Sequence, residues 1–150
     1  MNAPVHILNG PNLNLLGVRE PHLYGSTTLA QVEARCRALA AELGLACVFR
    51  QSNHEGVLVD WVQEARAARA ALIINPAGLS FRSIPLLDAL KTLDRPVIEV
   101  HITNIHRRDP PYQHSLTALG ATGVIAGLGP LGYELALHAV AHRLREAATV

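Results

Sequence analysis

Short apolar runs alternate along the chain with segments whose apolar residues recur at helical spacing. The runs are of strand length and lie at 5–8, 45–49, 71–74, 97–101 and 123–126. Apolar residues three or four positions apart predict helices at 29–43, from about 58 into the alanine-rich 65–71, at 84–93 and at about 133–145. The pattern therefore predicts a chain of five β–α repeats.

Residues at the ends of these segments support the same division. The stretch 26–28 offers N-cap candidates for the first long helix, and Gly44 is a typical stop signal after it. Pro85 falls near the start of its helix, where a missing N–H is tolerated. Nearly continuous apolar strands are typical of a parallel sheet buried on both faces. We therefore expect an α/β protein with a flavodoxin-like, five-stranded parallel sheet, helices on both faces, and one catalytic domain over residues 1–150.

Composition narrows the classes of partner. Apolar residues make up 49% of the 150-residue chain and the formal net charge is +1, which favours a globular protein without a basic surface for nucleic acid or anionic membranes. The two cysteines, Cys36 and Cys47, fall among apolar residues and are interpreted as small core side chains. The first residues show no basic region followed by a long apolar stretch, so we expect a cytoplasmic protein that acts on a small molecule.

Polar side chains follow the predicted strands at the edge where ligands bind in open α/β sheets. Asn12, Arg19 and Tyr24 follow the first strand in a long loop, and 51–56 follow the second. Residues after the third and fourth strands complete the set, which comprises Asn75, Glu99, His101, Thr103, Asn104 and His106. The carboxyl ends of parallel strands share one edge, so these groups can converge.

Two pairings within this set suggest acid–base chemistry. A guanidinium such as Arg19 beside the Tyr24 phenol favours the phenolate, which makes the tyrosine a candidate base. Glu99 and His101 are two apart on a strand and point to the same face, so the carboxylate can orient the imidazole as a candidate acid. The plainer alternatives are a hydrogen-bonded structural histidine, a packing tyrosine and simple turn chemistry in the asparagine-rich loop.

Two further motifs carry weaker signals. The glycines of 127–132 fit a G-x-G-x-x-G pattern, but no strand with an acidic residue follows to bind a ribose, so a tight strand-to-helix turn is preferred. His138 and His142 are spaced for a metal on one helix face, yet they lack a partner carboxylate motif, and an exposed helix face is preferred.

With these residues in view, the chain resembles the type II 3-dehydroquinate dehydratases over nearly its whole length. The segments that carry the resemblance are 7–17, 19–21, 24–29, 51–56, 74–76, 99–101, 104–106 and 123–129. The resemblance implies a lyase of aromatic amino acid biosynthesis (the shikimate pathway) or of quinate-type catabolism. It also implies a flavodoxin-like homododecamer, a tetramer of trimers, that works without a metal or organic cofactor.

The resemblance also implies roles for individual residues. Tyr24 would take a proton from C2 of the cyclic ketone with help from Arg19, and Asn12 would hold a water that stabilises the enolate. His101, oriented by Glu99, would protonate the departing C1 hydroxyl. The positions implied to bind substrate are Asn75, Ile102 and Thr103 at the carboxylate, and Asp88 reaching into a neighbouring subunit.

This chain departs from the family pattern at two positions. Phe81 stands where the family usually has a histidine, and Tyr112 where it has an arginine, both for the ring hydroxyls. One hypothesis is a dehydratase for a related, less hydroxylated cyclic keto acid; the competing one is that Arg82 or Arg107 restores the usual recognition. A third, non-enzymatic hypothesis is a small-molecule-binding module that retains the fold.

Overall fold

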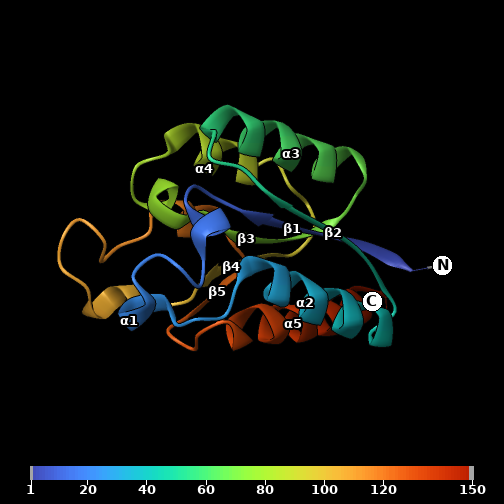
Figure 1. Ribbon diagram of the computed structural model, residues 1–150. Coiled ribbons are helices and arrows are strands. Elements are labelled where there is room, and N and C mark those ends of the chain that lie inside the picture. The colour runs from blue at the N-terminus through green and yellow to red at the C-terminus, as the bar shows by residue number, and fades with distance from the viewer. Residues whose placement is uncertain (1, 149–150) are drawn as a thin grey trace.

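The computed structural model describes residues 2–148 and is built around a five-stranded parallel sheet (Figure 1). The strands are β1 (Ala3–Asn9), β2 (Leu45–Gln51), β3 (Ala71–Asn75), β4 (Val97–His101) and β5 (Gly123–Ala126). Their spatial order is β2-β1-β3-β4-β5, and each neighbouring pair is parallel. This order confirms the predicted flavodoxin-like fold.

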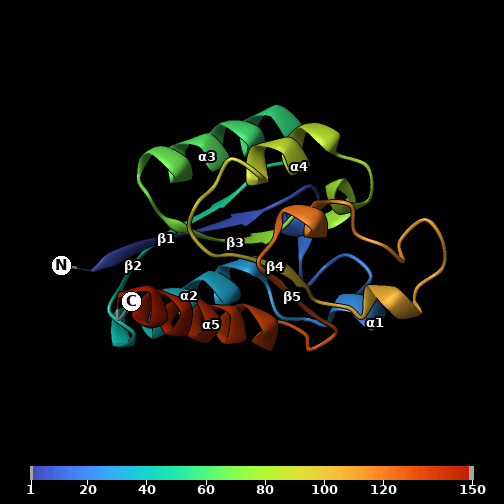
Figure 2. The ribbon, with the colours of Figure 1, turned by 180° about the vertical axis from the view of Figure 1, so that it is seen from behind.

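Helices cover both faces of the sheet. On one face lie α2 (Leu29–Glu42) and α5 (Leu131–Ala148); on the other lie α3 (Glu55–Ala67) and α4 (Ile84–Leu90), as Figures 1 and 2 show from opposite sides. Alternate residues of β1 serve the two layers: Val5 and Ile7 pack toward α2 and α5, whereas Leu8 packs toward α3 and α4. None of the helices in residues 2–148 is long and apolar enough to cross a membrane.

The helix ends follow from local chemistry. A capping box starts α2, in which Thr28 and Gln31 each accept a hydrogen bond from the backbone N–H of the other. Helix α3 ends at Ala67, whereas the predicted helix continued to 71. It ends there because Arg69 adopts φ +53° and the Ala70 N–H bonds back to the Ala65 carbonyl. This left-handed residue frees Ala71 to begin β3.

Other predicted boundaries also differ from the structure by a few residues. Helix α4 ends at Leu90 rather than at 93, because the N–H groups of Thr92 and Leu93 bond to carbonyls three residues back. The Thr92 hydroxyl also donates to the Ala89 carbonyl over 2.7 Å. The last helix begins at Leu131 instead of 133, directly after Pro130.

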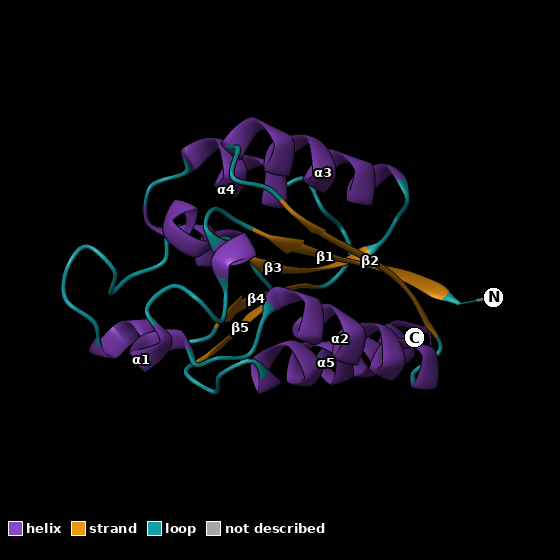
Figure 3. Ribbon diagram, viewed as in Figure 1, coloured by secondary structure: helices purple, strands orange, loops and turns teal. Residues whose placement is uncertain are grey.

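The long segment after β1 contains short helices that the apolar pattern did not predict. A 3₁₀ turn, η1 (Leu13–Leu15), and one turn of α-helix, α1 (Pro21–Tyr24), lie beyond the carboxyl ends of the strands (Figure 3). Further 3₁₀ turns follow the other strands: η2 (Ala77–Phe81), η3 (Ile105–Arg107) and η4 (Thr117–Gly120). These short turns lie around the carboxyl ends of the strands.

Candidate active site

A cavity of about 210 Å³ opens at the carboxyl ends of β1, β3 and β4. This is the switch point of the strand order, because the chain runs outward from β1 to β2 in one direction and to β3 in the other. The volume lies below the range of about 300–1,000 Å³ that is typical of sites for drug-sized ligands, so the cavity suits a small metabolite. Its lining includes nine of the predicted site residues, namely Asn12, Arg19, Tyr24, Asn75, Phe81, His101, Ile102, Thr103 and Tyr112.

Two guanidinium groups flank the Tyr24 phenol. Arg108 donates a hydrogen bond to the Tyr24 hydroxyl over 3.2 Å, and the Arg19 guanidinium lies 5.3 Å from the centre of the ring. The phenol stands at the end of α1, a helix that begins with Pro21 and closes with the bond from the Gly25 N–H to the Pro21 carbonyl. Arg108 thus contacts the hydroxyl itself, whereas Arg19 lies by the ring and also pairs with Glu20 over 3.3 Å.

His101 is held by a buried carboxylate. Its Nε2 lies 2.8 Å from Oε2 of Glu99, and the two side chains are 5% and 0% exposed. The spacing of two residues along β4 thus brings the pair together as predicted. Because Glu99 engages Nε2, the other ring nitrogen is left for a ligand in the cavity.

Two hydroxyl groups complete the environment of the carboxylate. Ser115 donates to Oε2 of Glu99 over 2.6 Å, and Thr117 donates to Oε1 over 2.5 Å. The buried carboxylate thus has three hydrogen-bond partners, one from β4 and two from the start of η4 and the residues just before it. The carboxylate is fixed in position, and it fixes the imidazole in turn.

Asn12 reaches the cavity through a strained backbone. It adopts φ +71°, and its N–H donates to Oδ1 of Asn53 over 2.9 Å. Gln51 supports the same turn by donating to the Gly10 carbonyl and to Asn53. The segment 51–56 was expected to converge on the site, but it does not line the cavity; Gln51 and Asn53 support the Asn12 loop, and Glu55 accepts a hydrogen bond from Ser83.

Close approach of two loops fixes the floor of the cavity. The Gly10 N–H donates to the Asn75 carbonyl, and a Cβ at Gly10 would lie 2.3 Å from the Pro76 carbonyl oxygen. Only glycine fits this position. The loops after β1 and β3 are thereby locked together, and with them Asn12 and Asn75.

Asn75 belongs to a buried hydrogen-bonded chain. Its Nδ2 donates to the Tyr133 hydroxyl over 2.9 Å, and that hydroxyl donates to Oδ1 of Asn9 over 2.7 Å. The Asn75 Oδ1 accepts the Ala77 N–H. Burial raises the pKa of Tyr133, so its hydroxyl keeps the proton that it donates. These bonds fix the Asn75 side chain in place at the lining of the cavity.

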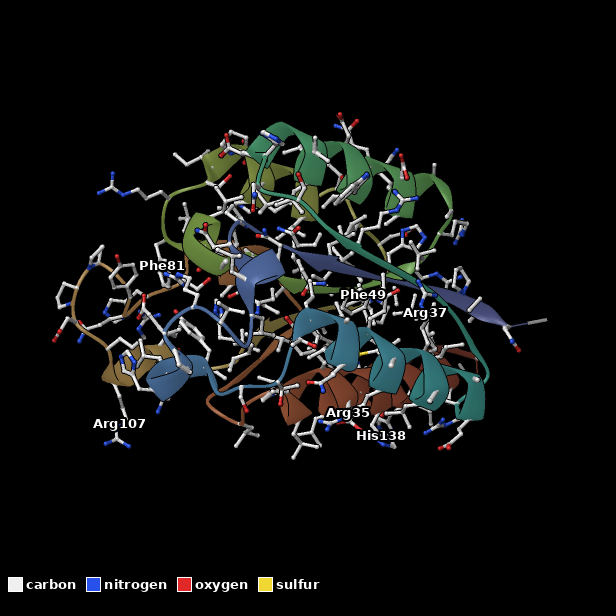
Figure 4. All side chains as sticks on the ribbon, viewed as in Figure 1. Arg35, Arg37, Phe49, Phe81, Arg107 and His138 are labelled. Carbon is white, nitrogen blue, oxygen red and sulfur yellow. The ribbon has the colours of Figure 1, made fainter. Side chains whose placement is uncertain are left out.

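Aromatic rings form the remaining side of the cavity. The rings of Phe81 and Tyr112 meet edge to face with centres 5.6 Å apart, and the Phe81 ring lies 6.3 Å from that of His101. Figure 4 shows Phe81 at this end of the molecule, whereas the labelled Arg107 extends away from the ribbon. Neither Arg82 nor Arg107 lines the cavity, so the hypothesis that one of them supplies a replacement cation there has no support in this conformation.

Four functional candidates were missed by the sequence reasoning. Arg108, Ser115 and Thr117 all lie in the irregular stretch after β4, and Tyr133 lies on the last helix. The doubled arginine at 107–108 was a signal that a cation follows the fourth strand, but nothing in the sequence says which one turns inward. Asp88 is exposed on α4 and does not line the cavity of its own chain.

The weaker sequence motifs have structural explanations in the fold. The glycines of 127–132 form a tight turn in which Gly127 and Gly129 adopt positive φ before α5, as the preferred interpretation predicted. His142 bonds Glu146 on the exposed side of α5. Among residues 2–148 no group of three or more His, Cys, Asp or Glu side chains is placed to hold a metal ion. The thiol of Cys36 is buried, and burial raises its pKa to about 12, as a core position requires.

Comparison with known proteins adds to this geometry. Residues 3–141 match the family described as Dehydroquinase class II. The chain is similar to the 3-dehydroquinate dehydratase of Caulobacter vibrioides, with 57% identity over 93% of this chain and 95% of the relative. The corresponding enzyme of Streptomyces coelicolor is 55% identical over 93% and 90%. The crystal structure of the type II dehydroquinase from Propionibacterium acnes superposes with a TM-score of 0.92 at 44% identity, covering 95% and 98% of the two chains.

Proposed function

The chain belongs to the class II dehydroquinase family, and on that premise we propose that it is a hydro-lyase that converts 3-dehydroquinate to 3-dehydroshikimate. The observation that carries the proposal is the pairing, in one cavity, of a phenol flanked by two guanidinium groups with an imidazole held by a buried carboxylate. Anti elimination of water through an enolate needs one base and one acid, and these two groups match those roles.

The first step is removal of a proton from C2, next to the C3 ketone. Tyr24 acts as the base, and the cations of Arg108 and Arg19 stabilise the phenolate that must form before the proton is taken. Asn12, at the entrance of the same cavity, holds a water against the developing enolate oxygen. Its left-handed backbone, tied to Asn53, keeps the amide in place while charge develops.

The second step is departure of the C1 hydroxyl. His101 donates a proton to that oxygen, and the electron pair of the enolate forms the C1–C2 double bond as water leaves. Glu99 stabilises the imidazolium that precedes this transfer, and Ser115 and Thr117 hold the carboxylate in position. The acid thus depends on a chain of three contacts behind it.

The substrate carboxylate binds at the ends of β3 and β4. Asn75 presents its amide there, and Ile102 and Thr103 follow His101 directly along the lining. With C1 held between this subsite and His101, C2 is directed toward Tyr24. Positioning of this kind is itself a large part of the acceleration that an elimination needs.

The assembly proposed for the chain is the homododecamer of the family, a tetramer of trimers, in the cytoplasm. Support comes from α4, where Asp88 and the 60%-exposed Ile84 are four residues apart and share one side of the helix. Leu119, on the neighbouring η4, is 72% exposed. If a neighbouring copy covers this apolar surface, the Asp88 of one copy would lie near the cavity of the other. Size-exclusion chromatography with light scattering gives the mass directly.

Steady-state turnover tests the proposed activity. Purified protein is mixed with 3-dehydroquinate, and the conjugated enone product is followed by its ultraviolet absorbance. We expect turnover that is lost in Tyr24→Phe, while calorimetry shows that the variant still binds the substrate. A binding module without catalysis would instead show equal binding and no turnover in both proteins, and that result would overturn the proposal.

A further inference from the structure

Phe81 and Tyr112 form an aromatic wall on one side of the cavity, between the proposed acid His101 and the proposed base Tyr24. It starts at the His101 ring, 6.3 Å from that of Phe81, and passes to Tyr112 through the edge-to-face contact at 5.6 Å. The Arg108 guanidinium then lies 4.6 Å from the centre of the Tyr112 ring and bonds the Tyr24 hydroxyl. Whatever occupies the cavity between acid and base must therefore contact Phe81 and Tyr112.

These two rings are held firmly. The two rings pack edge to face, and the Arg108 guanidinium lies over the face of the Tyr112 ring. The backbone supports the arrangement, since the Leu116 N–H donates to the Ser80 carbonyl over 2.6 Å. That bond ties the turn carrying Phe81 to the segment carrying Tyr112. The backbones that carry the two rings are thereby held close together.

The polar groups of the cavity are already engaged by the reacting half of the substrate. In the proposed reaction, His101 and Asn75 act at C1 with its hydroxyl and carboxylate, Tyr24 acts at C2, and Asn12 acts at the C3 oxygen. Of the side chains that this chain contributes, those left for the ring edge with the C4 and C5 hydroxyls of 3-dehydroquinate are Phe81 and Tyr112. Phe81 has no donor or acceptor, and Tyr112 has one hydroxyl on a ring that is 42% exposed.

We propose that Phe81 and Tyr112 make this site selective for a cyclic 3-keto acid that keeps the C1 hydroxyl and carboxylate but lacks the ring hydroxyls at C4 and C5. The inference rests on the proposed dehydratase function and specifies its substrate class. A hydroxyl pressed against the Phe81 ring loses its hydrogen bonds to water and gains none, and a loss of this kind reduces binding by about tenfold or more. An apolar CH₂ group at the same place gains contact with the ring.

Paired substrates test the inference. The value of kcat/KM is measured for 3-dehydroquinate and for 1-hydroxy-3-oxocyclohexane-1-carboxylate, which has the same reacting atoms and no C4 or C5 hydroxyl. Both products are enones and are read by the same absorbance. We expect the wild-type protein to prefer the deoxy compound by at least about tenfold. The double variant Phe81→His with Tyr112→Arg introduces donors on the wall and should shift the ratio toward 3-dehydroquinate by a similar factor.

Matched variants distinguish an effect of polarity at positions 81 and 112 from a nonspecific loss of activity. Phe81→Leu and Tyr112→Phe keep the wall apolar and should retain the preference for the deoxy compound, even if the rates change. If the wild-type protein prefers 3-dehydroquinate, the inference is overturned and the proposed function stands. The same holds if the ratio of the two kcat/KM values is unchanged in the double variant. A folded wild-type protein that dehydrates neither compound overturns both. Should the double variant fail to fold, the wild-type preference decides alone.

Discussion

Arg108 donates a hydrogen bond to the hydroxyl of Tyr24, although the two residues are 84 positions apart in the sequence. The contact joins the loop after β4 to the turn of helix after β1, across the mouth of the cavity. It also gives the phenol a second cation, in addition to the Arg19 guanidinium that the sequence suggested. Activation of the base therefore depends on two separate loops.

Removing this cation should weaken the base. In Arg108→Gln we expect kcat for the preferred substrate to fall by roughly 100- to 1,000-fold, the range for loss of one electrostatic donor at a reacting group. Arg108→Lys keeps the charge and should recover part of the rate. Arg107→Gln, next in the chain but directed away, is the control; an equal loss there would contradict the assignment.

Thr117 is expected to act through Glu99 rather than on the substrate. Thr117→Val keeps the shape of the side chain and removes its hydrogen bond to the buried carboxylate. We expect the free energy of unfolding to fall by about 2 kcal/mol, as is typical for a bond to a charged group, and kcat to fall with little change in KM. Thr92→Val removes a hydroxyl that bonds only a helix carbonyl, so its turnover should match the wild type.

The Tyr133 hydroxyl should matter for substrate binding. Tyr133→Phe leaves both the Asn75 amide and the Asn9 oxygen without their buried partner, which costs about 1–3 kcal/mol of unfolding free energy. The freed Asn75 amide should raise KM more than it lowers kcat. Chemical denaturation and steady-state kinetics measure the two effects. Loss of stability with an unchanged KM would show that the chain of bonds is purely structural.

The sequence could predict the parts of the site that depend on spacing along one strand or one loop. Apolar runs gave the strands and their parallel sheet, and the i, i+2 spacing brought Glu99 to His101. The sequence could not show that Thr117 or Tyr133 completes the site. Thr117 is 18 positions from Glu99, and Tyr133 is 124 positions from Asn9. Such pairs exist only once the helices have packed. The inward turn of Arg108, rather than Arg107, likewise depends on the conformation of an irregular loop.

Acid should destabilise the fold through His6. This histidine is buried on β1 with no hydrogen-bond partner for Nδ1. Burial lowers its pKa and the nearby Arg50 adds to the effect, while Glu64 opposes it. The folded state therefore prefers neutral His6, and the unfolded chain takes up a proton first as the pH falls below about 6.5. Stability from this site is full above that pH and is lost as the pH falls through the lowered value.

The variant His6→Leu removes the titrating group and retains an apolar side chain on the strand. We expect its unfolding free energy to vary less than that of the wild type between pH 7 and 5, as measured by urea denaturation. The exposed His138 gives the control, since His138→Gln should leave the pH dependence unchanged. Parallel curves for wild type and His6→Leu would contradict the assignment.

Exchange at C2 of 3-dehydroquinate in deuterated water tests the division of labour between Tyr24 and His101 most directly. Proton NMR follows loss of the C2 signal and formation of the enone separately. In His101→Gln the base is intact, so C2 should exchange with solvent while dehydration is lost, and in Tyr24→Phe both should stop. Exchange in Tyr24→Phe at the rate of His101→Gln would contradict the account, because another group would then be removing the proton.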